Sequence, residues 1–342
     1  MPSTLSTPAT PAALTRTERL RLWTAVRVGD AAALVSRLTG RGSGASIRGQ
    51  VLTRLDPDAF AELLQGHRVL AVSGTNGKTT TTHLLAAAVR AGLGTDARRL
   101  VTNADGANLH YGIASALSQQ PKSDIAVLET DERVVSDVIA HARPEILVLL
   151  NFSRDQLDRH HEIKALGRAW RHALDAAGES GPTIVANASD PLVVWSAGTA
   201  ARVIWVETAT TWSADGALCP ACGTVLRRLP ADERDHWDCP GCELTQPDAG
   251  YRVEGDHIVL PNGTMVHPDL QVPGSFNVSN AACALAAAIE FGVPLPDALA
   301  GMHTVTAPAG RFATAAFGRT RARLLLAKNP AGWAEALPLA TS

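Results

Sequence analysis

The order of elements in residues 68–91 constrains the fold more than any other feature of the chain. Arg68 to Val72 is an apolar strand, Thr81 to Ala91 is a helix, and the loop between them reads Ser73-Gly-Thr-Asn-Gly77-Lys78-Thr-Thr80. Backbone N–H groups in such a loop, with the N-terminus of the following helix, can point at the phosphates of a nucleotide. The order therefore predicts a phosphate-binding loop in an α/β fold.

Several residues of this loop have a distinct expected role. Glycine lets the backbone curl closely around the phosphates, Lys78 would reach them, and the Thr79 hydroxyl would ligate Mg²⁺. The predicted nucleotide-binding residues of the loop are Gly74, Thr75, Asn76, Gly77, Lys78, Thr79 and Thr80. The strict phosphate-loop pattern has glycine where this chain has Val72, so an ordinary Gly-Thr turn is the alternative interpretation.

Four further apolar segments alternate with helical ones, and this alternation predicts a parallel sheet covered on both faces. These segments are residues 125–128, 146–150, 183–186 and 203–206. Polar residues follow them, at the edge where open α/β sheets bind ligands. Glu129 is a candidate for holding Mg²⁺ and for catalysis, with an ordinary surface carboxylate as the alternative. Asn151 and Asp155 are further candidates, although Asp155 could instead complement a helix dipole.

The cysteines predict a metal site. Cys219 and Cys222 form one C-x-x-C pair, Cys239 and Cys242 form another, and sixteen residues separate the pairs. This spacing is typical of a zinc ribbon, in which four thiolates close a tetrahedral structural site. Two disulfides are the alternative, which the lack of an export signal disfavours. We expect a zinc-dependent insertion over residues 213–250, and Cys283 as a small core residue.

Composition bounds the remaining possibilities. A chain of 342 residues has room for two domains, or three. Lys and Arg total 31 against 33 for Asp and Glu, which argues against a general nucleic-acid binder. No run approaches the roughly 20 apolar residues of a membrane span. We expect a disordered leader at residues 1–20 without a secretory signal, a helical segment at residues 21–66, and a cytoplasmic protein.

Four segments resemble the Mur ligase family. The loop 73–80 resembles its ATP loop, which reads G-T-N-G-K-T without the earlier glycine. Residues 151–160 resemble its N-x-x-x-D-H-L-D segment, with Gln156 in place of the usual His. Residues 274–282 resemble the segment that holds the nucleotide, and residues 310–312 resemble its G-R-[FM] ribose contact.

This resemblance implies an ATP-binding Mur ligase fold. Its site residues would be Lys78, Glu129, Asn151 and Asp155 for catalysis, with Asn277, Asn280 and Arg311 as nucleotide contacts. A helix N-cap remains the alternative for Asn277, and a surface arginine remains the alternative for Arg311.

Four features narrow the resemblance to the MurT-type subfamily: residues 102–109, the Arg-Asp-Gln-Leu-Asp-Arg run at 154–159, the four-cysteine insertion and residues 326–333. Members of this subfamily are the ligase-like subunits of lipid II isoglutaminyl synthases, and they work with a GatD-like glutaminase. The resemblance implies that ATP phosphorylates the α-carboxylate of D-glutamate in the lipid II stem peptide. Ammonia from the glutaminase would then convert the acyl phosphate to D-isoglutamine. Expected cofactors are ATP, Mg²⁺ and Zn²⁺, and the membrane-anchored substrate would place the reaction at the inner face of the membrane.

The expected organisation follows from the same resemblance. Residues 67–312 would form the ATP-binding central domain, with the zinc ribbon inserted at 213–250. Residues 313–342 would begin a Rossmann-like C-terminal domain of which most is missing. Two other functions stay open: a remnant that binds ATP and zinc without completing amidation, and a folylpolyglutamate synthase, which shares the ATP loop but has no zinc insertion.

Overall fold

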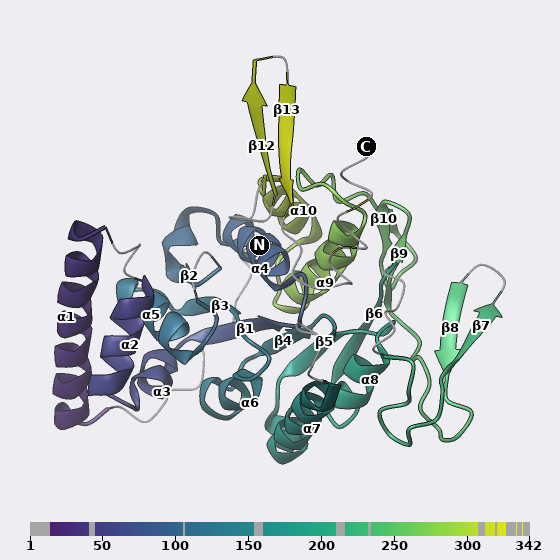
Figure 1. Cartoon of the computed structure of the whole chain (residues 1–342), viewed down its shortest axis with the longest axis horizontal. Coiled ribbons are helices and arrows are strands. Elements are labelled where there is room, and N and C mark those ends of the chain that lie inside the picture. The colour runs from purple at the N-terminus through teal and green to yellow at the C-terminus, as the bar shows by residue number, and fades with distance from the viewer. Residues whose placement is uncertain are drawn as a thin grey trace.

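The computed structural model describes residues 14–40, 45–104, 107–153, 160–209, 216–231, 234–306, 312–318 and 320–325, together with Trp333 and Leu337. A twisted sheet forms the centre of the molecule, helices cover both of its faces, and α1 lies at the outer edge (Figure 1).

The central sheet has nine strands in the order β11-β10-β9-β6-β5-β4-β1-β3-β2. Their bounds are β1 Arg68–Ser73, β2 Leu100–Thr102, β3 Ile125–Glu129, β4 Ile146–Leu149, β5 Thr183–Asn187, β6 Val203–Glu207, β9 Tyr251–Glu254, β10 His257–Val259 and β11 Met265–Val266. All neighbours from β2 to β9 pair in parallel, whereas β10 and β11 add antiparallel strands. The predicted, mostly parallel α/β sheet is confirmed.

Two hydrophobic cores lie on the two faces of this sheet. The first contains α4 (Lys78–Leu93), α9 (Phe276–Glu290) and α10 (Leu295–His303). The second contains α3 (Ala59–Leu64), α5 (His110–Gln119), α6 (Val135–Asp137), α7 (His160–Ala177) and α8 (Pro191–Ala197). Because both faces are covered, the inner strands are buried along their whole length, which explains their unbroken apolar sequences.

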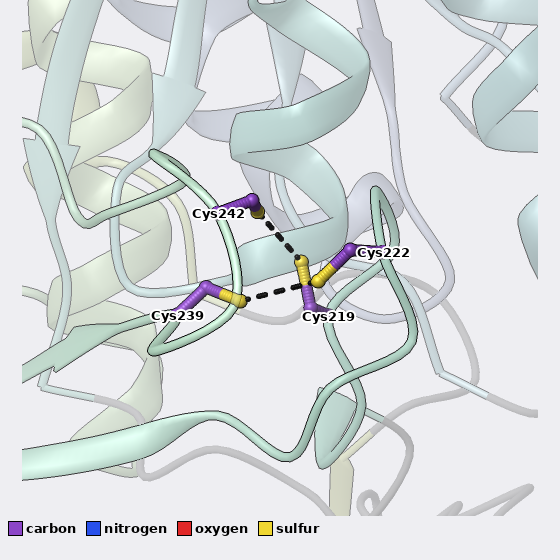
Figure 2. Close-up of side chains that lie close together, drawn as sticks. All are labelled: Cys219, Cys222, Cys239 and Cys242. Carbon is purple, nitrogen blue, oxygen red and sulfur yellow. Dashed lines mark hydrogen bonds between the residues drawn. The ribbon is translucent and has the colours of Figure 1, made fainter.

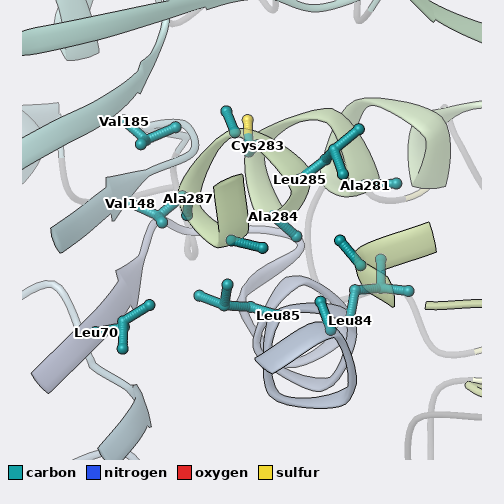
Figure 3. Close-up of a cluster of buried hydrophobic side chains, with 14 of the residues drawn as sticks. Leu70, Leu84, Leu85, Val148, Val185, Ala281, Cys283, Ala284, Leu285 and Ala287 are labelled. Atoms are coloured by element: carbon teal, nitrogen blue, oxygen red, sulfur yellow. The ribbon is translucent and has the colours of Figure 1, made fainter. Parts of the chain in front are cut away.

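The first core depends on the alanine-rich helix α9. Figure 3 shows Ala284 and Ala287 of α9 on the side of the helix toward Leu85 of α4 and the strand residue Val148. Small side chains let α9 approach the strands closely. Cys283 is 1% exposed within this core, and burial raises the pKa of its thiol to about 12. The prediction of a small core residue is confirmed.

The N-terminal region is helical, with α1 (Arg16–Leu38) and α2 (Ala45–Leu55) preceding α3. A capping box begins α1: Thr15 Oγ1 accepts a hydrogen bond from Glu18 N, and Glu18 Oε2 accepts one from Thr15 N at 2.7 Å. No helix in the described part of the chain is both long and apolar enough to cross a membrane.

A separate antiparallel pair, β12 (Phe312–Phe317) and β13 (Thr320–Leu325), follows α10 and stands out from the molecule (Figure 1). The family resemblance predicts that residues 313–342 begin a Rossmann-like domain. The described part of this segment is a hairpin whose strands pair only with each other. The domain boundaries remain predictions.

Candidate functional site

The candidate site lies where the chain reverses its direction of travel across the sheet. After β1 the chain builds β2 and β3 on one side, and it then crosses to β4 on the other side of β1. In open α/β sheets such a switch point leaves a crevice at the carboxyl ends of the strands. The loop 73–80, Glu129 and Asn151 all follow the strands that meet there.

Two glycines give the loop 73–80 its shape. Gly74 has φ +143° and Gly77 has φ +83°, values that side chains disfavour. A Cβ on Gly77 would lie 2.4 Å from Asn280 Oδ1, and one on Gly74 would lie 2.8 Å from Leu150 Cβ. The loop therefore packs closely against both α9 and the end of β4, which brings the predicted residue Asn280 to it.

The segment after β4 holds the backbone of this loop. Asn151 Oδ1 accepts a hydrogen bond from Asn76 N at 2.9 Å, and Asn151 Nδ2 donates to Asn76 O at 3.0 Å. Thr75 Oγ1 accepts from Ser153 N at 3.0 Å, and Asn76 Nδ2 donates to Ser153 Oγ at 2.9 Å. The amide of Asn151 thus pairs with the main chain of the loop, so its contacts are those of a positioning residue.

Lys78 begins α4 and is 8% exposed. Its Nζ donates to the carbonyl of Gly74, to Thr75 O at 3.2 Å and to Glu132 Oε2 at 3.1 Å. The position of Glu132 is fixed in turn by Trp170, whose Nε1 donates to the Glu132 carbonyl at 2.8 Å. A buried ammonium group therefore lies inside the loop, facing three oxygen atoms.

Glu129 ends β3 and is 4% exposed. Its main chain forms two hydrogen bonds of 2.8 Å with the side-chain amide of Asn103, and its Oε1 accepts from Asn108 Nδ2 at 3.0 Å. Thr79, in the first turn of α4, is also buried. A carboxylate and a hydroxyl are ligand types that Mg²⁺ accepts, so these residues suit such an ion.

A second carboxyl group beside Lys78 has an altered pKa. Burial raises the pKa of Asp131, but hydrogen bonds from Arg133 and the charge of Lys78 outweigh that effect and lower it overall. Arg133 Nε donates to Asp131 Oδ1 at 2.7 Å. Asp131 therefore stays ionised at neutral pH.

The start of α9 corrects one expectation. Its N-cap is Ser275, so the N-cap interpretation of Asn277 is wrong. Asn277 lies in the first turn, where its Nδ2 donates to Pro273 O at 2.6 Å and its Oδ1 accepts from Asn280 Nδ2 at 2.9 Å. This chain of hydrogen bonds sets the orientation of Asn280 toward Gly77.

Four residues of this arrangement were not predicted from the sequence: Asn103, Asn108, Glu132 and Ser153. Glu132 lies in the polar run that follows β3, the two asparagines lie in the segment 102–109 and Ser153 lies in the segment 151–160, so a signal was present for each. Asp155 and Arg311, which sequence analysis also proposed, lie outside the described residues.

The four predicted metal ligands converge in space. Cys219 Sγ is 3.6 Å from Cys242 Sγ, and Cys222 Sγ is 3.4 Å from Cys239 Sγ (Figure 2). All four sulfurs lie within 4.8 Å of one another. Sulfurs bound tetrahedrally to zinc at about 2.3 Å lie about 3.8 Å apart, whereas a disulfide requires about 2.05 Å. All four cysteines are free thiols, so the set fits a zinc ion better than two disulfides.

The two C-x-x-C turns flank a hairpin, β7 (Arg227–Ala231) and β8 (Arg234–Asp238), inserted between β6 and β9. Burial raises the pKa of Cys219 to about 12, whereas Thr224, 3.2 Å from the Cys222 sulfur, lowers the pKa of that thiol to about 6. The buried Trp237 attaches the insertion to the sheet domain, because its Nε1 donates to Ala188 O at 3.2 Å.

Residues 72–215 match the family described as the Mur ligase middle domain. This part of the chain is similar to a Mur ligase middle domain. This domain begins in β1, contains the loop 73–80, Glu129 and Asn151, and ends just before the cysteine insertion. The resemblance to the Mur ligase family is therefore confirmed for residues 72–215.

Curated relatives agree with a Mur ligase assignment. The chain is similar to the MurT subunit of lipid II isoglutaminyl synthase from Staphylococcus aureus N315, with 29% identity over 92% of this chain and 73% of that protein. The MurT subunit of Streptococcus pneumoniae R6 is 29% identical over 90% of this chain and 70% of that protein. A UDP-N-acetylmuramate–L-alanine ligase of Arthrobacter sp. FB24 is 32% identical over 71% of this chain and 44% of that protein.

Solved structures show the same Mur ligase fold. A pseudomurein peptide ligase type C from Methanothermus fervidus superposes with a TM-score of 0.59 and 22% identity, over 79% of this chain and 56% of that one. A UDP-N-acetylmuramoyl-L-alanyl-D-glutamate–2,6-diaminopimelate ligase gives 0.51 and 20% identity, over 81% of this chain and 53% of that one. Together, the family match and the curated relatives indicate an ATP-dependent ligase.

Proposed function

We propose that this chain is the ATP-using subunit of an enzyme that amidates the α-carboxylate of D-glutamate in the lipid II stem peptide. The observation that carries this proposal is the similarity to two MurT subunits over at least 90% of the chain. Because both relatives are named as subunits, the proposal includes a GatD-like glutaminase as the partner that supplies ammonia. The four cysteines would hold a structural zinc ion that leaves no coordination position open.

The loop 73–80 would bind the nucleotide phosphates. Its glycine-shaped backbone lies at the N-terminus of α4, where N–H groups and the helix dipole favour negative charge. The ammonium group of Lys78 would exchange its carbonyl contacts for phosphate oxygens. Thr79 and Glu129 would hold Mg²⁺, which supplies charge neutralisation at the phosphates when bound. Asn277 and Asn280 would contact the nucleotide from α9, and Arg311 would contact its ribose.

The proposed reaction has two steps. An oxygen of the substrate carboxylate attacks the γ-phosphorus, the bond to the β-phosphate oxygen breaks, and ADP leaves. Ammonia then attacks the carbonyl carbon of the acyl phosphate, inorganic phosphate leaves, and a proton is released as the amide forms. The first step brings two anions together, so the charge of Lys78 at the phosphate would stabilise its transition state. We propose Asp155, which lies outside the residues that the structure describes, as a further catalytic residue. Asn151 would keep the loop 73–80 in place.

The proposal is tested by incubating the purified chain with a GatD-like glutaminase, ATP, glutamine and lipid II. Mass spectrometry should show lipid II in which one hydroxyl is replaced by an amino group, with ADP formed in equal amount. Ammonium chloride should replace glutamine and the glutaminase at high concentration. ATP binding without amidated product from either nitrogen source would contradict the proposal and support a remnant that only binds its ligands.

A matched pair of glycine variants tests the loop. Gly77 has φ +83° and Gly263 has φ +81°. An alanine at either position is therefore strained, and the strain destabilises the fold by roughly 1–2 kcal/mol in both variants. Only at Gly77 does the new Cβ meet another residue, since nothing lies within 4 Å of a Cβ on Gly263. We expect Gly77→Ala to weaken ATP binding at least about tenfold by calorimetry, with Gly263→Ala at wild-type affinity. Equal affinities in the two variants would show that the loop does not bind ATP.

A further inference from the structure

Helix α1 packs with its small residues inward and leaves its large apolar residues exposed. Ala25, Gly29 and Ala33 are its buried positions, and a Cβ on Gly29 would lie 3.0 Å from Arg48 O of α2. The exposed apolar side chains are Leu20, Trp23, Val28, Leu34, Val35 and Leu38, each at least 44% exposed. An ordinary surface helix has the opposite arrangement.

The exposed residues form one continuous stripe. At about 100° per residue they fall within an arc of roughly 140°, on the side opposite Gly29. From Leu20 to Leu38 the stripe is about 27 Å long at 1.5 Å per residue. We call these six residues the α1 stripe. Figure 1 shows α1 at the outer edge of the molecule, where its outer side can lie against a flat surface.

The charges around the α1 stripe have one dominant sign. Helix α1 contains five arginines and two carboxylates, although the whole chain has a net charge of −2. Glu18 caps the helix, and Asp30 pairs with Arg48 and, at 3.8 Å, with Arg27 of the same helix. Four of the arginines are exposed beside or within the stripe: Arg16, Arg19, Arg27 and Arg37. The fifth, Arg21, pairs with Asp56, Asp58 and Glu62 and so attaches α1 to the rest of the protein.

We propose that α1 docks the protein on an anionic lipid bilayer. The α1 stripe would enter the boundary between headgroups and acyl chains, and the arginines would extend to the lipid phosphates. Trp23 suits this boundary because its ring is amphipathic. The charge and exposure of α1 support this docking by themselves. Its purpose, to bring the site to a lipid-linked substrate, rests on the proposed function.

Two other occupants fit the α1 stripe less well. A second copy related by a two-fold axis would place the same helix opposite itself and bring arginines toward arginines. Residues 1–13 of this chain contain only Met1 and Leu5 as large apolar residues and no carboxylate. They offer neither the apolar length nor the negative charge that the stripe requires.

Vesicle flotation tests the proposal with the full chain. We expect binding to phosphatidylcholine vesicles that contain about a third phosphatidylglycerol, and much weaker binding to phosphatidylcholine alone. Leu20→Ser/Leu34→Ser/Leu38→Ser should weaken binding roughly tenfold or more, whereas the exposed control Met265→Ser should not. Arg16→Ala/Arg19→Ala/Arg37→Ala should lose about fivefold per arginine, with the exposed pair Arg98→Ala/Arg168→Ala as its control.

Three results would overturn this proposal. The first is equal flotation of the wild-type chain with neutral and with anionic vesicles. The second is flotation of the leucine variant at the wild-type level. The third is that second result together with loss of self-association or of glutaminase binding, which would assign the α1 stripe to a protein partner. Vesicle binding without amidation would contradict only the proposed function, and amidation without vesicle binding would contradict only the docking.

Discussion

Replacing Lys78 by methionine should reduce ATP-dependent amidation by about a thousandfold, the scale seen when one preorganised cationic or hydrogen-bonding group is removed from a transition state. Methionine keeps most of the side-chain volume of lysine, so the change removes chiefly the charge. The loss should appear in both ADP formation and amidated product. It is measured by steady-state kinetics with the glutaminase present and by calorimetry with ATP.

Two controls separate this effect from a folding defect. Lys122→Met removes an exposed lysine and should leave the rate unchanged. In Lys78→Met the carboxyl group of Glu132, which is 14% exposed, loses its partner and can destabilise the fold. The double variant Lys78→Met/Glu132→Gln removes both charges and should regain thermal stability without regaining activity. Recovery of activity in the double variant would show that Lys78 acts only through the fold.

Replacing Cys239 by serine should release the zinc ion and unfold the insertion between β6 and β9. Metal binding contributes roughly 10 kcal/mol or more to small domains of this kind, far more than one short hairpin can supply. Elemental analysis should find about one zinc per wild-type chain and much less in the variant. Limited proteolysis should then cut the variant within residues 216–246.

Cys283→Ala is the matched control for the zinc prediction, because it removes the cysteine that lies outside the cluster. It should retain zinc and lose little stability, since it exchanges one small core side chain for another. The zinc site would be refuted by a wild-type chain without zinc, or by equal zinc content in Cys239→Ser and Cys283→Ala.

The parts of the fold that depend on local sequence were predictable. Strands β3 to β5 are almost wholly buried and β6 is partly buried, and the apolar runs of all four end within a residue or two of the predicted bounds. The strand β2 has only three residues, too few for a pattern. The order of strands and the addition of β9 to β11 depend on pairings between distant segments, which periodicity does not encode.

In the candidate site, too, local sequence predicted some features, and contacts between distant segments determined the others. The motif of the loop 73–80 identified Lys78 and Gly77, but the contact between Gly77 and Asn280 joins residues about two hundred positions apart and appears only in the fold. The polar run from Glu129 to Glu132 at the end of β3 offered three carboxylates, and only its folded path shows that Glu132 is the one paired with Lys78. The N-cap of α9 is Ser275, two residues before Asn277, so the alternative interpretation of Asn277 as a cap is replaced by contacts within the first turn.

The central claim, that the chain uses ATP to activate a carboxylate, is tested most directly by following an oxygen atom. Lipid II with heavy oxygen in the α-carboxylate of its D-glutamate is incubated with the chain, its glutaminase, ATP and glutamine, and the released phosphate is analysed by mass spectrometry. Each amide formed should yield one phosphate that carries a single labelled oxygen, because the carboxylate oxygen leaves with the phosphoryl group. Amidation with unlabelled phosphate, or labelled lipid II recovered without amide, would contradict the account.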